Sequence, residues 1–217
     1  MMPYGDKYKS YTYAVYYAGK HERSLGQRLS NWRERRVVAA ALRWLGPITT
    51  VLDIPSGTGR FLPVLAQFRL RVVAADQAAE MLKGGRRYYD RFAHPPQPLA
   101  GSAFQIPLAD ESIDAALCSR LLHHLALPEQ RITVMRELAR VVRVGAVVSF
   151  FDAASLKHRR RLRRRMRKGK LGNRHAVTRR EFTEEARQAG LKCVSMHGLL
   201  RFHTELTAAA LLKRDSE

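Results

Sequence analysis

The sequence predicts an α/β fold, in which one mostly parallel sheet carries helices on both faces and ends in an antiparallel hairpin. Short apolar runs alternate with helical periods along most of the chain. Parallel strands need crossover helices, so this alternation favours a parallel sheet. The first apolar run also passes through a glycine-bearing turn into a helix. With 217 residues, 46% of them hydrophobic, the chain can bury one sizeable core. We therefore expect a single domain over residues 1–217.

A lead-in helix is expected before the sheet. Val38, Ala41, Leu42 and Leu45 follow the i, i+3, i+4, i+7 spacing of one helix face, and Gly46-Pro47 ends the period. The elements expected next are a strand at 48–54, a helix at 60–68, a strand at 70–75, a helix at 78–90, a strand at 113–119, a helix at 128–142 and a strand at 146–151.

The last part of the chain predicts a helix and a hairpin. A helix at 179–189 follows the N-cap residue Thr178 and ends before Gly190. Strands at 191–196 and 205–213 then lie close together with no helix between them, which is typical of an antiparallel pair at a sheet edge.

Three segments fall outside this alternation. Residues 93–101 contain three prolines, which exclude a helix, and we expect a surface loop. Residues 1–30 mix tyrosines with polar groups and are expected to form an N-terminal cap segment. Residues 154–177 are expected to form a basic insertion.

Charge and cysteine content limit the function classes. A formal net charge of +20 favours an anionic partner without identifying it. Cys118 and Cys193 lack metal-ligand spacing and lie in apolar contexts, so we expect buried, reduced, structural thiols and no metal site. No signal peptide or membrane-spanning run is evident, and we expect a cytoplasmic protein.

The turn after the first strand is the most informative segment. Gly57 and Gly59 lack a Cβ, which lets a ligand approach the backbone at the start of a helix. The second strand run is followed by Asp76, 17 residues after Gly59. An acid at that point can accept hydrogen bonds from both ribose hydroxyls. Strand, turn, helix, strand and acid together predict a site for a nucleoside-type cofactor.

Three segments carry a family resemblance: Asp-Ile-Pro-Ser-Gly-Thr-Gly from Asp53, Ala-Asp-Gln-Ala-Ala-Glu-Met-Leu from Ala75, and Gly-Ser-Ala-Phe-Gln-Ile-Pro-Leu-Ala-Asp-Glu-Ser-Ile-Asp from Gly101. With Leu-Leu-His-His-Leu from Leu121 and the stretch 136–145, they resemble class I S-adenosylmethionine-dependent methyltransferases, in particular the ubiquinone/menaquinone-type branch. The resemblance implies a Rossmann-like sheet of seven strands and S-adenosylmethionine as cofactor.

The resemblance also implies cofactor-binding roles. Asp53 would orient the turn and approach the methionine amino group, Asp76 would hold the ribose, and Gln77 and Met81 would flank the adenine. The remaining implied cofactor-binding residues are Tyr17, Pro55, Gly57, Gly59, Ser102, Ala103, Ser119 and Arg120.

The sequence departs from the family pattern at three points. Pro55 stands where most members have the first glycine, so one backbone donor is absent from the turn. Ser102 falls where many members have an aspartate facing the adenine. Ala146 follows Gly145 where a second glycine is frequent, a change expected to affect a turn.

No catalytic residue can be assigned. Methyl transfer from a sulfonium needs alignment and exclusion of water, and a general base is optional. His123 and His124 are candidates by position, and one of these neighbours is expected to point into the core. His124 and Asp152, just past the fifth strand, are the candidate substrate-binding residues.

The stretch from Lys157 to Lys170 holds ten lysines and arginines and no acid. It can be a solvated segment, or a phosphate-binding surface for RNA, for an anionic membrane or for an anionic lipid or sugar-phosphate substrate. The expected function is methylation of a small-molecule or lipid-linked substrate, which can be anionic. The alternatives are an RNA methyltransferase and a non-catalytic, cofactor-binding adaptor for nucleic acid or a membrane surface. The turn from Pro55 to Arg60 does not fit the Gly-x-Gly-x-x-Gly pattern of nicotinamide dehydrogenases.

Overall fold

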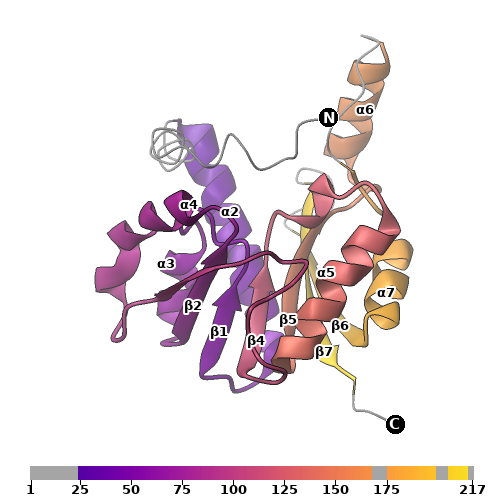
Figure 1. The fold of residues 1–217 in the computed structure, drawn as a ribbon. Coiled ribbons are helices and arrows are strands. Elements are labelled where there is room, and N and C mark those ends of the chain that lie inside the picture. Colours follow the sequence, from indigo (N-terminus) through magenta and orange to yellow (C-terminus); the bar gives the residue numbers. More distant parts are fainter. Residues whose placement is uncertain (1–23, 168–174, 199–204, 215–217) are drawn as a thin grey trace.

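The computed structural model describes residues 24–167, 175–198 and 205–214, and they form a seven-stranded sheet in the order β3-β2-β1-β4-β5-β7-β6 (Figure 1). The five strands β1 to β5 run parallel, whereas β7 is antiparallel to both of its neighbours. The predicted fold class is confirmed. The strands are β1 (Thr50–Asp53), β2 (Arg71–Asp76), β3 (Gln97–Ala100), β4 (Ile113–Cys118), β5 (Val142–Phe151), β6 (Leu191–Gly198) and β7 (Leu206–Lys213).

Helices cover both faces of the sheet (Figure 1). One apolar cluster joins α2 and α3 to the face that carries Val51, Val72 and Leu117. The other joins α5 and α7 to the opposite face, which carries Leu52 and Ala116. The helices are α2 (Leu25–Leu42), α3 (Leu62–Gln67), α4 (Ala79–Lys83), α5 (Pro128–Val141), α6 (Leu156–Met166) and α7 (Arg179–Gln188), with short 3-10 turns η2 (Arg43–Leu45), η3 (Arg86–Arg91) and η4 (Leu122–His124).

The strand order reverses between β1 and β4. The chain adds β2 and β3 on one side of β1, and it then returns to place β4 and β5 on the other. The crossover from β1 to β2 runs through α3 on one face of the sheet, and that from β4 to β5 runs through α5 on the other. Open parallel sheets bind their ligands at such a reversal, and this directs attention to the residues after β1, β2 and β4.

The helix α2 begins earlier than the periodicity predicts. Ser24 accepts a hydrogen bond from the backbone of Gln27, whose side chain returns one to Ser24, so a capping box starts the helix. Residues 25–30, which the sequence analysis assigned to the N-terminal cap segment, thus belong to α2. Their side chains are largely exposed, and apolar periodicity cannot detect helical turns that do not pack on the core.

The proline-rich connection was expected to be a loop throughout, and this is wrong in part. Residues Gln97–Ala100 form β3, which pairs in parallel with β2. It is an edge strand and only Leu99 is partly buried, so it has no apolar run. Pro98 is tolerated because an edge strand can leave one side without backbone partners.

Two further expectations need correction. Gly145 lies inside β5 and not in a turn, since α5 passes directly into β5 at Val142. A Cβ at Gly145 would lie 2.1 Å from the carbonyl oxygen of Leu211, so glycine is required for β7 to approach. The helix expected at 78–90 is divided at Gly84 and Gly85 into α4 and η3.

The predicted final hairpin is confirmed as an antiparallel pair of β6 and β7, and β7 also pairs with β5. The described part of the basic stretch lies in α6 and the residue after it, and α6 has no buried residue and stands clear of the sheet (Figure 1). None of the helices in the described ranges is long and apolar enough to cross a bilayer.

Candidate functional site

The carboxyl ends of β1 and β2 bring two buried aspartates together. Asp53 ends β1 with 1% of its surface exposed, and Asp76 ends β2 with 9%. The Asp53 carboxylate accepts a hydrogen bond from the Ser56 hydroxyl at 2.7 Å. The Asp76 carboxylate accepts two, from the N–H groups of Gly57 at 2.8 Å and of Ala78 at 2.9 Å. The two aspartates therefore hold the glycine turn from both sides.

The two glycines of the turn are required for different reasons. Both have a left-handed φ, 56° at Gly57 and 73° at Gly59, which favours glycine. A Cβ at Gly59 would lie 2.7 Å from a methyl group of Leu62 and 3.0 Å from Gly85, so Gly59 permits internal packing. A Cβ at Gly57 would meet only Met81, at 3.8 Å. Gly57 thus leaves its backbone accessible to a ligand.

Pro55 does not destroy this turn. The Ile54–Pro55 peptide bond is cis, and the chain is held on either side of it by backbone hydrogen bonds. Ile54 donates to the carbonyl of Leu117 at 2.9 Å, and Ser56 donates to that of Ala75 at 2.8 Å. The turn is therefore anchored to both neighbouring strands.

The Asp53 carboxylate is incompletely satisfied. No donor among the described residues reaches its Oδ1 atom, although that atom is buried. Burial, opposed by the Ser56 hydrogen bond and assisted by the negative charge of Asp76, raises the pKa of Asp53 to about 7. Burial also raises the pKa of Asp76. A cationic donor placed against Asp53 Oδ1 would satisfy the atom and favour the carboxylate, and the ammonium group of an amino-acid ligand is such a donor.

A polar contact that the sequence analysis did not predict joins α2 to this edge of the sheet. Glu34 pairs with Arg60, which follows the glycine turn, at 2.7 Å, and with Arg120, which follows β4, at 3.0 Å. Asn31 accepts a hydrogen bond from Arg60 at 2.9 Å. Asn31 and Glu34 are both buried and lie one turn apart, and this pair of polar residues on one face was the available sequence signal.

The end of β4 contributes Ser119 and Arg120. The Ser119 hydroxyl lies 3.1 Å from that of Ser149 in β5, and Ser149 also accepts the Arg120 N–H at 2.8 Å. Arg120 has a left-handed φ of 64°, uncommon outside glycine and frequent at functional turns. Both predicted residues thus lie beside the β1–β4 reversal.

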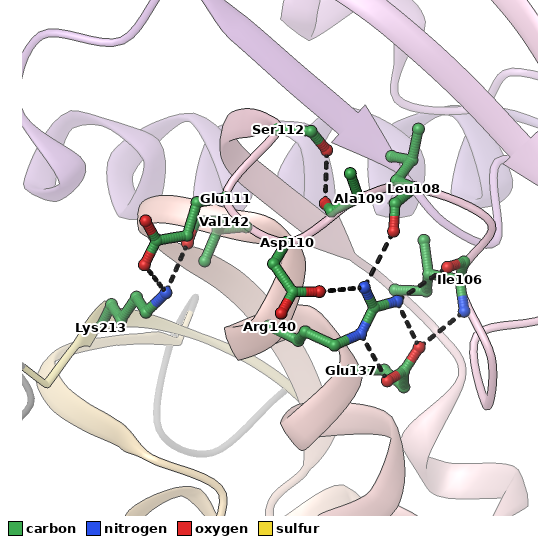
Figure 2. A network of polar contacts seen from close by, with 10 residues as sticks. All are labelled: Ile106, Leu108, Ala109, Asp110, Glu111, Ser112, Glu137, Arg140, Val142 and Lys213. Atoms are coloured by element: carbon green, nitrogen blue, oxygen red, sulfur yellow. Dashed lines mark hydrogen bonds and ion pairs between the residues drawn. The ribbon is translucent and has the colours of Figure 1, made fainter.

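The loop after β3 is fixed by a single arginine of α5 (Figure 2). Arg140 donates to the carbonyls of Ile106 and Leu108 at 2.8 and 2.9 Å and to Asp110 at 2.7 Å. It also pairs with Glu137, which accepts the Ile106 N–H at 2.8 Å. The Arg140 hydrogen bonds hold the pKa of the Glu137 carboxyl below its ordinary value.

These contacts of Arg140 and Glu137 position the segment that carries Ser102 and Ala103. Ala103 is buried, and the Ser102 hydroxyl accepts the N–H of Phe104 at 3.2 Å. Gln77 is exposed after β2, whereas Met81 in α4 is buried. These four residues lie on segments that leave the carboxyl ends of β2 and β3. Tyr17 lies outside the described residues.

The two histidines differ as the sequence analysis expected. His123 is 1% exposed, and its ring stacks on Phe151 with centroids 4.0 Å apart. His124 is only partly buried, and its ring centroid lies 4.0 Å from that of His123. Of this pair, His124 is the one nearer to solvent.

Asp152 is held in place by the protein itself. One of its carboxylate oxygens accepts the N–H of Ala154 at 2.9 Å, and the other pairs with Arg179 at 2.9 Å. Nearby, Glu205 pairs with Arg161 of α6. Burial lowers the pKa of His158 in the same helix, and the positive charge of Arg161 adds to the effect. Asp152 and Glu205, two acids near the end of β5, therefore each have an arginine partner.

Cys118 is fully buried and Cys193 partly so, neither forms a disulfide, and burial raises the pKa of both thiols. Within the described ranges, no group of three histidine, cysteine, aspartate or glutamate residues could hold a metal ion.

Comparisons with known proteins agree on one class. Residues 52–150 match the model of a family described as a methyltransferase domain. A methyltransferase-like protein of Schizosaccharomyces pombe is 35% identical over 94 residues, which cover 43% of this chain and 34% of that protein. A demethylmenaquinone methyltransferase of Mycobacterium sp. (strain KMS) is 36% identical over 111 residues, 51% of this chain and 44% of that protein. The aligned part thus spans less than half the length of these curated relatives.

Solved structures share the fold over nearly the whole chain. Magnesium protoporphyrin IX methyltransferase from Synechocystis PCC 6803, solved with S-adenosylhomocysteine, has a TM-score of 0.72 at 14% identity and covers 96% of this chain and 97% of its own. A methyltransferase from Thermotoga maritima, described as a possible histamine N-methyltransferase, has a TM-score of 0.62 at 19% identity and covers 86% of this chain and 92% of its own.

Proposed function

We propose that the chain transfers a methyl group from S-adenosylmethionine to a small-molecule or lipid-linked acceptor, because residues 52–150 match a methyltransferase domain family. The predicted Rossmann-like fold is confirmed by the solved structures. The match of residues 52–150 to a methyltransferase domain supports the predicted enzyme class and cofactor. A structure of the Synechocystis enzyme with S-adenosylmethionine has the same fold, with a TM-score of 0.67 at 12% identity.

One observation carries the proposal: Asp53 has a buried carboxylate oxygen that no donor of the described residues reaches, beside the accessible backbone of Gly57. We assign Asp53 to the cofactor's ammonium group, because a buried carboxylate needs a partner of this charge. We assign Asp76 to the ribose hydroxyls, since an acid at the end of the second strand is placed for them.

The other proposed cofactor contacts follow from position. The turn of Pro55, Gly57 and Gly59 would face the methionine and ribose portions. Gln77, Met81, Ser102 and Ala103 would surround the adenine, and Ser119 and Arg120 would lie beside the methionine end. Each of these residues lies on a segment that leaves the carboxyl end of β1, β2, β3 or β4.

Methyl transfer from a sulfonium does not require acid–base catalysis by the side chains. The sulfonium supplies an electrophilic methyl group, so the protein has to align the acceptor and exclude water. His124 and Asp152 are proposed as acceptor contacts at the ends of β4 and β5. The Asp152 carboxylate already pairs with Arg179, so it is suited to accept a hydrogen bond from the methyl-accepting molecule and less suited to remove a proton from it as a general base.

The proposal is tested by calorimetry and then by transfer. The folded protein should bind S-adenosylmethionine and S-adenosylhomocysteine with micromolar affinity, and either ligand should raise the melting temperature by mass action. Absence of binding heat from both ligands would overturn the proposal. Preferential binding of a nicotinamide dinucleotide would do so as well.

The acceptor class needs a separate experiment, because the fold supports many acceptors. Radiolabelled cofactor should be incubated with total RNA, lipid extract and small-metabolite pools, and label is expected in the lipid or metabolite pool. Label in RNA would favour the alternative that the basic helix α6 suggests. Cofactor binding with no label in any pool would favour a non-catalytic adaptor.

A further inference from the structure

The outward face of α6 is a strongly basic surface. Arg161 pairs with Glu205, and its guanidinium lies 5.7 Å from the Phe151 ring, so one side of the helix faces the protein. That side also carries the partly buried His158 and Arg165. The exposed basic residues occupy the rest of the helix and the residue after it. We call this set the basic face: Lys157, Arg159, Arg160, Arg163, Arg164 and Arg167.

The basic face has no counter-charge from the part of the chain that the structure describes. α6 contains no acid, and the acids nearest its root, Asp152 and Glu205, already pair with Arg179 and Arg161. None of the ion pairs formed among the described residues includes a member of the basic face. Because like charges concentrated on one helix repel one another, a polyanion bound there would relieve the repulsion.

Exposed apolar side chains gather at the same end of the molecule. α2 runs from the carboxyl edge of the sheet, where Glu34 meets Arg60 and Arg120, so its preceding turns lie beyond that edge. These turns carry Leu25, Leu29 and Trp32 at i, i+4 and i+7, exposed by 81%, 46% and 51%. Further exposed apolar residues on segments that leave the carboxyl ends of strands are Phe104, Leu127, Leu162 and Met166.

We propose that this end of the molecule docks on the surface of an anionic membrane, with the basic face against acidic lipid headgroups and the exposed apolar side chains in the interface. Arginines alone would suit RNA equally well, because phosphate contacts need only cations. The exposed Leu, Trp and Met side chains decide between them, since they gain free energy on entering the headgroup and acyl boundary. Docking goes beyond methyl transfer, and it would open the proposed site toward lipid-linked acceptors.

Sedimentation with vesicles tests the basic face. The protein should sediment with phosphatidylglycerol-containing vesicles at low salt and remain in solution with pure phosphatidylcholine vesicles. Each arginine near an acidic surface strengthens partition about fivefold. The triple variant Arg160→Gln, Arg163→Gln and Arg164→Gln should therefore bind about 100-fold more weakly.

The matched control removes three charges elsewhere. Arg71, Lys192 and Arg214 are exposed and lie at the opposite ends of strands, at the start of β2, the start of β6 and just after β7. Their combined change to glutamine lowers the net charge equally and should leave vesicle binding within about twofold. If both triple variants lose binding alike, the effect is one of net charge and the docking face is wrong.

The fluorescence emission of the two tryptophans provides an independent test of docking that needs no cofactor. The sequence contains only Trp32 and Trp44, and both are half exposed, by 51% and 54%. Trp44 lies in η2, 12 residues further along, which places it about 18 Å from Trp32 at 1.5 Å per helical residue. An interfacial element enters the boundary only about 5–10 Å. The Trp44→Phe protein should therefore show a blue-shifted emission with anionic vesicles, and the Trp32→Phe protein should not.

Three results would overturn the proposal: equal binding to neutral vesicles, no emission shift from Trp32, or binding to single-stranded RNA in place of vesicles. In the last case the logarithm of affinity should fall with the logarithm of salt by about 0.7 per phosphate contacted. None of these measurements uses the cofactor, so the proposed methyl transfer can fail while docking holds, and the reverse is equally distinguishable.

Discussion

Asp53 and Asp152 occupy equivalent places in the two halves of the sheet, and their surroundings differ. Both are acids at the carboxyl end of a parallel strand, 1% and 6% exposed. Asp152 has each carboxylate oxygen occupied, one by Arg179. Asp53 has no cationic partner among the described residues, and its Oδ1 has no donor. Position and burial are therefore alike at these two acids, whereas the presence of a cationic partner within the protein separates them.

The same contrast separates the halves more widely. In the half built by β1 and β2, Asp53 accepts a hydrogen bond from a hydroxyl and Asp76 accepts two from backbone N–H groups, and neither pairs with a cation of the described residues. In the half built by β5, α5 and α7, the acids Asp152, Glu185 and Glu205 each pair with an arginine. We infer that the first arrangement serves the cofactor, whereas the arginine pairs of the second stabilise the fold and do not contribute to cofactor binding, and substitutions in both halves test this.

The largest effect on stability is expected at Glu185. Its carboxylate pairs with Arg131 between α7 and α5, and both side chains are less than 10% exposed, at 7% and 6%. Glu185→Ala would leave a buried guanidinium without its partner and should lower the free energy of unfolding by about 3–5 kcal/mol. Denaturant titration measures this. Cofactor affinity in the folded fraction should be unchanged.

The neighbouring residue provides the control. Glu184 pairs with Arg187 on the surface of α7, where both side chains are about half exposed. Glu184→Ala should leave the denaturation midpoint where it is, because exposed pairs are screened by solvent. Equal losses at both positions would mean that removal of any α7 carboxylate acts on the helix itself.

A smaller loss is expected at Arg140, which links α5 to the loop after β3 (Figure 2). Arg140→Met removes its hydrogen bonds to two loop carbonyls and two carboxylates. The free energy of unfolding should fall by about 2–3 kcal/mol, typical for bonds that involve a charged group. Cofactor affinity should also fall, since the loop carries Ser102 and Ala103. Unchanged affinity would separate this loop from the proposed adenine contacts.

Sequence reasoning reached the site on the β1–β2 side because local signals coincide there. The buried strands end at Asp53 and Asp76, and the turn between them needs glycine, so chain order alone places them together. The edge strand β3 was not predicted from the sequence, because it is exposed and contains Pro98. The ion pairs of Glu34 were not predicted, because its partners, Arg60 and Arg120, are 26 and 86 residues away in the sequence.

Gly145 shows a different limit. Glycine is required there because of the carbonyl of Leu211 on β7, a strand that follows α6, α7 and β6 in the sequence and pairs with β5. Likewise, Asp53 and Asp152 have the same sequence signal, a short acid after an apolar run. The distant Arg179, which pairs with Asp152, has no counterpart at Asp53 among the described residues. Pairing across a sheet is a tertiary property that no local pattern contains.

Asp76 and Asp152 give the most direct comparison between an acid proposed to bind the cofactor and an acid that pairs within the protein. Asp76→Ala should weaken S-adenosylmethionine binding by about 1–3 kcal/mol, the usual loss of a charge-assisted hydrogen-bond partner. Asp152→Ala removes an equally buried acid and should leave the cofactor dissociation constant unchanged. Calorimetry on both proteins, with circular dichroism to verify folding, measures the difference. An unchanged dissociation constant for the Asp76 variant would remove Asp76 from the site.

The smallest effect is a pH dependence set by Asp53, whose pKa is raised by burial from 3.8 to about 7. The folded protein binds this proton more tightly than the unfolded chain does, so the contribution of Asp53 to stability is full below about pH 4 and declines as the pH rises to 7. A cationic ammonium group prefers the ionised carboxylate, so cofactor affinity should change in the opposite direction. It should increase up to tenfold per pH unit below 7 and level off above it. Asp53→Asn has no proton to lose, and its affinity should be weak and independent of pH over this range. Calorimetry in two buffers of different ionisation enthalpy should detect proton release on binding near pH 6.5, in the parent protein only. If the parent and the Asn variant give the same pH profile, the ammonium group of the cofactor does not bind at Asp53.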